Sequence, residues 1–417
     1  MTVAGAMIAL PLTLLRTKYN RQQTEATEAA LLNNKLDAAF AGLFARKTAT
    51  SRTRPVVYQS DGQEITTSET LDSPFSLPKG AIEIARGPWQ ILSEEVDDII
   101  TRATAIDRLE GLAQEHPEQA DRIASVLSLY VRELSREYPP KECPATTWRN
   151  LNTDTEDCPG LDAHTIHREF GLHPDVTDPS SIRGWARSLK PVRSDMEKAV
   201  QTLGRMTNTV TIGSSLKQIN LMGSNLQGFD LSGLNFEGAV LANCSLDGTR
   251  MHDTKMRAVN FGHASLIGAE ALSTDLSETS FICANLECIA LDLANLWKSD
   301  IRLNEAKSAT LVQSNLAGVR INSSDFSYTN MNGALFDDDT RLFMVLLEGS
   351  SLKGVDLRKV QITPSEIEKA FGDASTLLPD DVYRPSHWPT ISLDPLGFDQ
   401  CLEDWRYKLK RDSSSPS

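Results

Sequence analysis

A five-residue pattern runs through residues 214–336, and its clearest units read ANLEC (284–288), ANLWK (294–298), SNLAG (314–318) and SDFSY (324–328). An apolar side chain returns at every fifth position from Leu216 to Phe336, and only Ala271 and Ala306 are small. This period fits neither the helical repeat nor the strict alternation of a flat strand. The pattern therefore predicts a repeat architecture in which each short unit buries its apolar side chain by stacking on the next.

Three columns of side chains define the repeat. The apolar column supplies the predicted core: Leu216, Leu221, Leu226, Leu231, Phe236, Leu241, Leu246, Phe261, Leu266, Leu276, Phe281, Leu286, Leu296, Leu311, Leu316, Phe326 and Phe336. A mostly small residue stands two positions earlier, as at Ala239, and Asn or Asp is frequent one position earlier, as at Asn220. Small and large side chains that alternate inward can fill a narrow interior in successive layers. Asn and Asp suit tight turns because their side chains bond the local backbone.

These units resemble the A(D/N)LXX unit of the pentapeptide-repeat family. The resemblance implies a right-handed quadrilateral β-helix, in which each unit forms one of the four faces of a coil. We therefore predict a mainly β solenoid of this kind, with an α-helical N-terminal region and helical caps. Coils that stack at roughly 4.8 Å, the spacing of paired strands, would give a rod on the order of 30 Å long.

The two ends of the repeats carry helix signals. Residues 194–210 read as a capping helix with Ser194 as N-cap and Glu197 at the third helical position, which is a capping box. The repeats occupy residues 211–360, and the frame slips by one near Asp337, which we interpret as a solvated bulge and not a metal site. Residues 361–417 form a C-terminal capping helix, which starts at Thr363 and Pro364, and a tail.

Residues 1–18 read as an N-terminal membrane anchor. The first fifteen residues carry no charge and are followed by Arg16, Lys18 and Arg21. A spanning helix needs about 20 apolar residues, so the run is short. The basic flank predicts contact with the lipid bilayer from the cytoplasmic side of the inner membrane. The alternative is a docked or disordered arm of a cytoplasmic protein.

Residues 19–137 read as mostly helical. We expect a helix over 20–47, a loop with local β structure over 48–88, and a helical hairpin over 89–137 that is interrupted at His116 and Pro117. This layout resembles a membrane-anchored subset of bacterial pentapeptide-repeat proteins. The first hairpin helix of that subset usually opens with a Val-Arg-Leu-Gly-Gly-like run, whereas this chain has Thr101–Ala105 there.

Residues 138–193 read as a Pro-rich linker or insert. They contain one cluster of potential zinc ligands, Cys158, His164, His167 and His173. The cluster lacks the paired spacing of a structural zinc site, so we expect neither a metal nor any other cofactor. The six cysteines of the chain are too few and too scattered for a disulfide framework and indicate a reducing, intracellular setting.

The sequence gives no sign of catalysis. GxSxG, Walker, GxGxxG and HExxH motifs are absent from the sequence, and the convex surface of such a rod is a poor place to desolvate a reaction. We therefore do not expect an enzyme. The net charge of −14 argues against direct binding of nucleic acid through its phosphates.

Three functional readings stay open. The first is a non-catalytic, membrane-associated scaffold with an unknown protein partner, since repeat solenoids commonly serve as binding surfaces. The second is a DNA mimic that binds a type II topoisomerase, as some pentapeptide-repeat proteins bind gyrase. Residues 211–360 hold 17 acidic and 12 basic side chains, and Lys255, Arg257 and Lys298 interrupt any acidic stripe, which disfavours a mimic. The third is a structural or stress-related protein with no defined partner.

Overall fold

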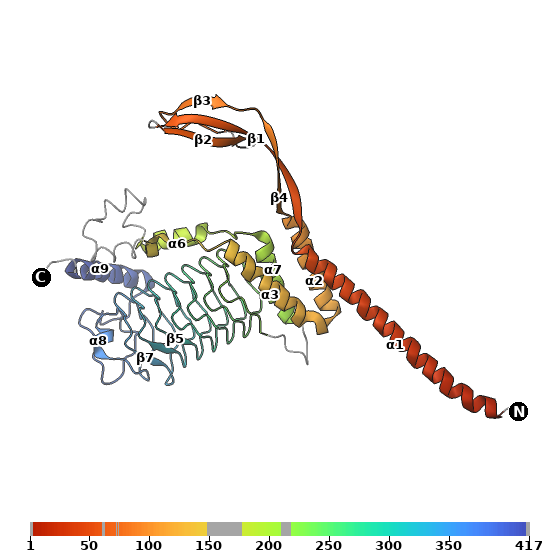
Figure 1. Ribbon diagram of the computed structural model, residues 1–417. Coiled ribbons are helices and arrows are strands. Elements are labelled where there is room, and N and C mark those ends of the chain that lie inside the picture. The colour runs from red at the N-terminus through yellow and green to blue at the C-terminus, as the bar shows by residue number, and fades with distance from the viewer. Residues whose placement is uncertain are drawn as a thin grey trace. The chain divides into compact units, whose positions relative to one another are not determined.

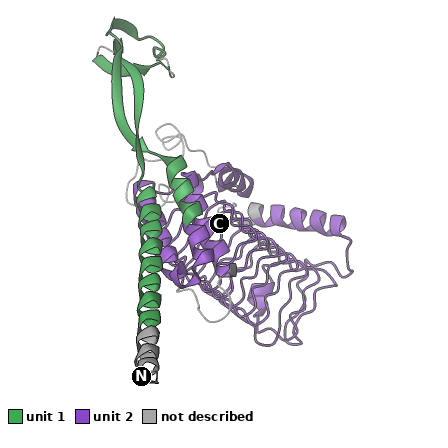
Figure 2. Cartoon of the chain, turned by 90° about the vertical axis from the view of Figure 1, so that its right-hand side faces the viewer, with its two compact units in different colours: residues 1–108 green, residues 109–417 purple. Residues whose placement is uncertain are grey.

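The structure is a computed structural model that describes residues 3–60, 63–71, 73, 75–147, 177–209 and 218–413. Only the backbone is described at 3–15, 208–209, 410 and 412–413. The chain divides into two compact units, residues 1–108 and residues 109–417, which are coloured separately in Figure 2.

The first unit contains α1 (Val3–Gly42), a β-sheet and the start of α2 (Ile99–Glu115). The long strand β1 (Arg46–Ser60) pairs antiparallel with β2 (Gln63–Thr70), β3 (Ile82–Arg86) and β4 (Gln90–Asp97). Its first half pairs with β4 and its second half with β2 and β3. α1 meets α2 at Gly42, where an added Cβ would lie 2.8 Å from the Cβ of Ala105. Leu36, Leu43 and Ile106 are buried in this unit.

The sheet corrects two expectations for this region. Residues 48–88 are mostly strand and not loop, and the helix expected from Trp89 begins only at Ile99, because residues 90–97 form β4. Ile91, which fits a helical stripe, lies on β4 and is 71% exposed. The Arg54 Nε donates to Glu69 Oε2 over 2.6 Å and lowers the pKa of Glu69. Such pairing between separate segments leaves no trace in the local apolar pattern.

The predicted membrane anchor gains no support. Residues 3–18 form the beginning of α1, which continues without a break to Gly42. Across the described residues, no helix combines the length and the apolar character that crossing a bilayer requires.

The second unit contains the rest of α2, several further helices and a long stack of coils. The helices are η1 (Pro117–Gln119), α3 (Ala120–Glu137), α6 (Pro179–Ser188), α7 (Ser194–Thr209), α8 (Pro364–Ile367) and α9 (Pro395–Ser413). α3 packs against α7. Between them Tyr130 Oη donates to Asp195 Oδ2 over 2.6 Å, and the guanidinium of Arg193 donates to both carboxylate oxygens of Asp195. This buried ion pair fixes the start of α7.

Residues 218–377, which we call the repeat stack, form parallel coils (Figure 1). Single bridges join positions 20 residues apart at four places in each coil, starting with Asn220 to Val240, Asn225 to Ser245, Asp230 to Arg250 and Asn235 to Lys255. The short strands β5 (Asp300–Arg302), β6 (Arg320–Asn322) and β7 (Arg341–Phe343) are equivalent segments of three consecutive coils. Each five-residue unit therefore supplies one side of a four-sided coil.

The column of Asn and Asp residues stabilises the turns at the corners of the coils. The Oδ1 atom of Asn220 accepts the backbone N–H of Met222 over 3.0 Å, and many Asn and Asp residues of this column make the same bond. The corner residue that follows has a positive φ, as Gly223 does after Asn220 and Cys288 does after Asn285. Because the Asx bond fixes the turn, the corner tolerates side chains that would otherwise avoid this backbone conformation.

The one-residue slip is confirmed. Asn315 bridges Leu335, 20 residues on, whereas Asp325 bridges Leu346, 21 residues on. The extra residue lies in a turn where Asp337 accepts the backbone N–H groups of Gly318 and Asp339. Burial alone would raise the pKa of Asp337, but these bonds outweigh it and the pKa is lowered.

The repeats extend beyond the expected end at residue 360, because Ser351 bridges Phe371 and Asp356 bridges Leu377. The capping box at Thr363 forms, with its N–H bonded to Glu366 Oε2 over 2.8 Å, but α8 has only four residues and lies between two bridged positions. The longer helix α9 packs against the side of the stack near this end. Its Trp405 ring lies 5.3 Å from the ring of Phe371.

The first coil is closed by α7 and α3. In later coils these backbone N–H groups donate to the preceding coil, as when the Ser245 N–H donates to the Ser224 oxygen over 3.0 Å. In the first coil, the equivalent N–H groups of Asn225, Asp230 and Asn235 donate to Ser135 Oγ, Glu197 Oε1 and Gly204 O. The Glu197 carboxylate thus bonds the edge of the stack. An open sheet edge would leave these donors without partners.

Candidate interaction surface

The sides of the repeat stack are named by their bridging positions. Face A holds positions 220, 240, 260, 280, 300, 320 and 341, and face B holds positions 225, 245, 265, 285, 305, 325 and 346. Face C holds positions 230, 250, 270, 290, 310, 330 and 351, and face D holds positions 235, 255, 275, 295, 315 and 335. A partner that binds the side of the stack must meet one of these faces or a corner between two of them.

Face B is covered in its first coils by residues 138–147, which we call the first strap. The Gln227 side chain bonds both backbone groups of Lys141, with its Oε1 accepting the N–H and its Nε2 donating to the oxygen, each over 2.8 Å. The same Nε2 donates to Asp247, whose carboxylate also accepts the N–H of Ile267. Burial raises the pKa of Asp247 despite these bonds. Part of the expected linker is therefore fixed against the stack.

The corner between faces B and C is covered by residues 177–189, the second strap, which contains α6. Glycine occupies this corner in three successive coils, at Gly228, Gly248 and Gly268. A Cβ at Gly248 would lie 2.1 Å from the oxygen of Ala186, and a Cβ at Gly268 would lie 2.5 Å from the Cβ of Ala186. Only glycine permits so close an approach. The 20-residue spacing of these glycines is the signal in the sequence that could have revealed the strap.

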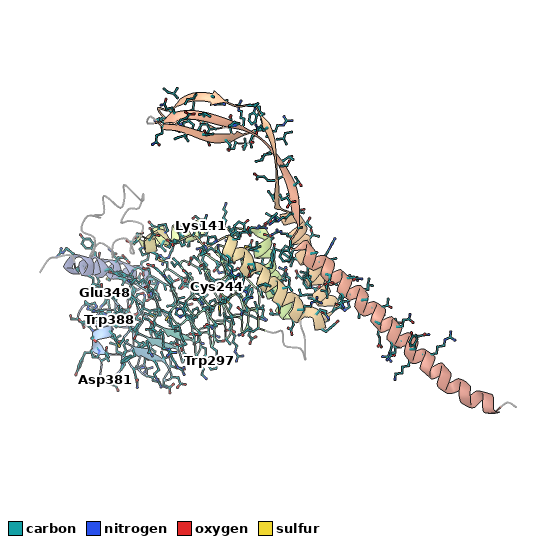
Figure 3. The ribbon with its side chains drawn as sticks, in the orientation of Figure 1. Lys141, Cys244, Trp297, Glu348, Asp381 and Trp388 are labelled. Atoms are coloured by element: carbon teal, nitrogen blue, oxygen red, sulfur yellow. The ribbon has the colours of Figure 1, made fainter. Side chains whose placement is uncertain are left out.

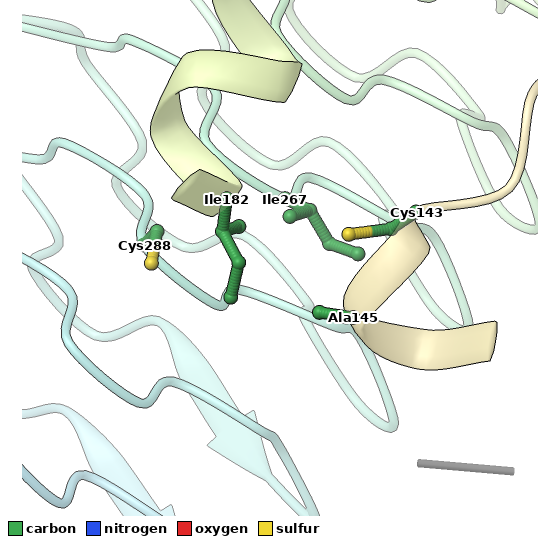
Figure 4. Close-up of a cluster of buried hydrophobic side chains, with 5 residues drawn as sticks. All are labelled: Cys143, Ala145, Ile182, Ile267 and Cys288. Atoms are coloured by element: carbon green, nitrogen blue, oxygen red, sulfur yellow. The ribbon is translucent and has the colours of Figure 1, made fainter. Parts of the chain in front are cut away.

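A small apolar cluster joins both straps to the stack. Figure 4 shows Cys143 and Ala145 of the first strap, Ile182 of the second, and Ile267 and Cys288 of the stack, all of them buried. Burial raises the pKa of the Cys143 thiol, so this cysteine behaves as a small apolar side chain. The described ends of the expected linker are therefore part of the folded domain.

The C-terminal helix continues the cover along the same corner. Arg406 of α9 donates to the oxygen of Gly349 over 2.8 Å, and Gly349 occupies the corner position equivalent to Gly268. Lys353 Nζ donates to Leu393 O over 2.7 Å on face C. The chain thus covers one side of its own stack from both directions.

Faces A and D, which we call the open side, carry no strap among the described residues of the second unit. Figure 1 shows α6 and α9 along one side of the stack, whereas β5 and β7 of the stack itself lie on the opposite side. Figure 3 places Lys141 of the first strap and Trp297 of face D on opposite sides. Large apolar side chains are exposed here, with Phe343 of face A 63% and Leu335 of face D 62% accessible. Met344, at the adjoining corner of faces A and B, is 63% accessible.

Charges on the open side alternate in sign. Arg302 pairs with Asp300 over 2.7 Å on face A, and Arg257 of face D pairs with Glu278 over 2.9 Å. Lys298 lies over the ring of Trp297. The open side is thus a mixed polar and apolar surface.

The described core positions predicted from the sequence are buried, with the exception of Phe336, which is partly exposed. Leu216 lies outside the described residues, as do the potential zinc ligands Cys158, His164, His167 and His173. Among the residues that the structure does describe, no three His, Cys, Asp or Glu side chains are grouped to hold a metal ion.

Stacked five-residue units of this kind define a repeat protein. The sequence model of the pentapeptide repeats matches residues 219–257 and 254–297, with eight copies of the repeat. The chain therefore carries pentapeptide repeats, as its sequence indicates. The match does not include the N-terminal region, so the resemblance to a membrane-anchored subset stays a prediction.

Similar solved structures are pentapeptide-repeat proteins of low identity. HetL from the cyanobacterium Nostoc, involved in heterocyst differentiation regulation, is 20% identical, with 41% of this chain and 89% of that chain covered and a TM-score of 0.21. Trypsin-treated QnrB1, a plasmid-mediated fluoroquinolone resistance protein, is 18% identical, with 45% and 96% covered and a TM-score of 0.29. No curated protein matches the chain in sequence.

Proposed function

We propose that the chain is a non-catalytic scaffold whose repeat stack, a right-handed four-sided β-helix, binds a protein partner through the open side. The observation that carries the proposal is the asymmetry of the stack. The two straps and α9 cover the first coils of face B and its corner with face C, whereas Phe343, Met344 and Leu335 are more than half exposed on or beside faces A and D. Exposed apolar side chains within a polar surround are typical of protein-binding surfaces.

The charges of the open side favour this reading over mimicry of DNA. Arg302, Lys298 and Arg257 stand among the carboxylates of faces A and D. A surface that imitates the phosphates of a duplex needs an uninterrupted negative potential. A mixed surface instead suits a protein partner with complementary charges at the rim.

The test uses the purified full-length chain, immobilised, with a lysate of the source cells. A double substitution, Phe343→Ser with Met344→Ser, removes two exposed apolar groups of the open side. The matched control is Leu396→Ser with Tyr407→Ser, because these α9 side chains are 81% and 70% exposed away from faces A and D. We expect the wild type and the control to retain a common protein that the open-side variant loses.

Equal retention by all three proteins would place the binding surface elsewhere and overturn the proposal. A supercoiling assay with purified gyrase and a quinolone, run on the same proteins, separates the alternative. Protection of gyrase by the wild type would favour the DNA mimic over the scaffold.

A further inference from the structure

A polar cavity of about 130 Å³ lies between α3 and the first coil of the repeat stack. Ser125, Ser128 and Arg132 line it from one face of α3, and Gln218 and Asn220 line it from the start of face A. One water molecule needs roughly 10–15 Å³ of such space. The cavity is therefore large enough for several water molecules or for a small oxyanion.

Arg132 brings a positive charge and one unpartnered donor atom to this cavity. Its Nε atom is buried and has no hydrogen-bond partner among the described residues. Neighbouring arginines are all paired: Arg136 with Glu133, Arg193 with Asp195 and Arg205 with Glu110. Buried donors are nearly always bonded, and leaving one without an acceptor costs free energy. The Arg132 Nε–H therefore lacks an acceptor among the residues that the structure describes.

The edge of the first coil adds a second donor. Its N–H groups at faces B, C and D donate to Ser135 Oγ, Glu197 Oε1 and Gly204 O. The fourth N–H of this row belongs to Asn220, on face A. By the regularity of the stack it points away from the second coil, as its three counterparts do, and no described residue accepts it. Asn220 lines the cavity with Arg132.

We propose that this cavity binds a small oxyanion, either a carboxylate or an inorganic phosphate-type anion. The Arg132 guanidinium supplies the charge and several planar donors. The Asn220 N–H completes the row of edge donors, and the hydroxyl of Ser128, which is mostly buried, adds a further donor. Charge-assisted bonds of this kind are stronger than neutral ones. This site lies at the capped end of the stack, at the first position of face A, and the proposal does not rest on the partner binding proposed above.

Calorimetric titration tests the site with two probes, inorganic phosphate and acetate, on the full-length protein. Arg132→Gln removes the charge, and Arg136→Gln is the matched control, because Arg136 is exposed on the same helix and pairs with Glu133. We expect one anion to bind the wild type and the control with the same dissociation constant. In Arg132→Gln the dissociation constant should rise at least about tenfold, because one charge-assisted hydrogen bond to the anion is lost.

The two probes separate the possible sources of the anion. Binding of acetate alone indicates a carboxylate ligand, and binding of phosphate alone indicates a phosphate-type ligand. A wild type that binds neither, or an Arg132→Gln variant that binds as well as the wild type, overturns the proposal.

A melting experiment checks the folding of the variants. Arg132→Gln should melt at or above the wild-type temperature in anion-free buffer, because it removes an unpartnered buried group. Only the wild type and Arg136→Gln should gain stability when the anion is added. A gain of the same size in Arg132→Gln would show that the anion acts elsewhere and would count against the site.

Discussion

Gly248 and Gly233 occupy similar corners of the repeat stack but differ in what lies against them. Both have a positive φ, of 63° and 71°, whereas a Cβ would meet the Ala186 oxygen at 2.1 Å in the first and nothing within 4 Å in the second. Gly233→Ala should therefore lower the free energy of unfolding only by about 1 kcal/mol, which is the cost of a side chain in a left-handed backbone conformation. Gly248→Ala should cost clearly more and should displace the second strap.

Thermal melting measures the difference in stability, and limited proteolysis measures the displacement. Cleavage within residues 177–189 should become faster in Gly248→Ala and stay slow in Gly233→Ala. Equal cleavage of both variants would mean that the strap is not held by the corner glycines.

Asp195 links stability to pH. Burial would raise its pKa, but the bonds from Arg193 and Tyr130 outweigh it, and the folded-state pKa lies below the usual value. A carboxylate whose pKa is lower in the folded state than in the unfolded state stabilises the fold. This stabilisation is fully present above the unfolded-state pKa of about 3.9, and it is lost as the pH falls through the folded-state pKa. Asp195→Asn should lower the free energy of unfolding by about 3–5 kcal/mol at neutral pH, because it leaves the buried Arg193 guanidinium without a carboxylate.

Urea unfolding of both proteins at several pH values checks this. The difference in unfolding free energy between wild type and Asp195→Asn should be constant above about pH 5 and should shrink below about pH 4. A difference that does not change with pH would mean that the carboxylate is not ionised in the folded state.

At the scale of the element, α7 closes the first coil through Glu197 and Gln201. Glu197 Oε1 accepts the N–H of Asp230 over 2.9 Å, and Gln201 Nε2 donates to the Asp230 oxygen over 2.9 Å. Glu197→Ala should cost about 1–3 kcal/mol, since it leaves an edge donor without a partner. Glu237→Ala, an exposed substitution on the same coil, is the control and should stay within about 0.5 kcal/mol of the wild type. Chemical unfolding compares the two, and equal losses would argue against edge capping by α7.

The elements that could be predicted are those with local signals. The five-residue period of the stack could be predicted from columns such as that of Leu286, because every unit repeats the same pattern of apolar, small and polar side chains. The sheet over residues 46–97 could not be predicted, because β1 and β4 are held by pairing between separate segments, and apolar residues such as Ile91 are exposed. The open side could not be predicted either. The outward columns look alike in sequence, and which faces are covered depends on straps that reach Gly248 from far along the chain.

At the scale of the whole molecule, the stack should lose its cohesion when one central layer is disrupted, because each coil contacts only its neighbours. Leu286 lies in the middle of the stack and is 1% exposed, with Leu266 one coil before it. Leu286→Asp removes a core side chain and buries an unpaired carboxylate, which should cost at least about 4 kcal/mol. The control is Leu293→Asp, the same substitution at a corner that is 54% exposed in the same coil. Circular dichroism melting should show a large loss for the first variant and almost none for the second. Similar melting of both variants would contradict an interior built from the fifth-position column.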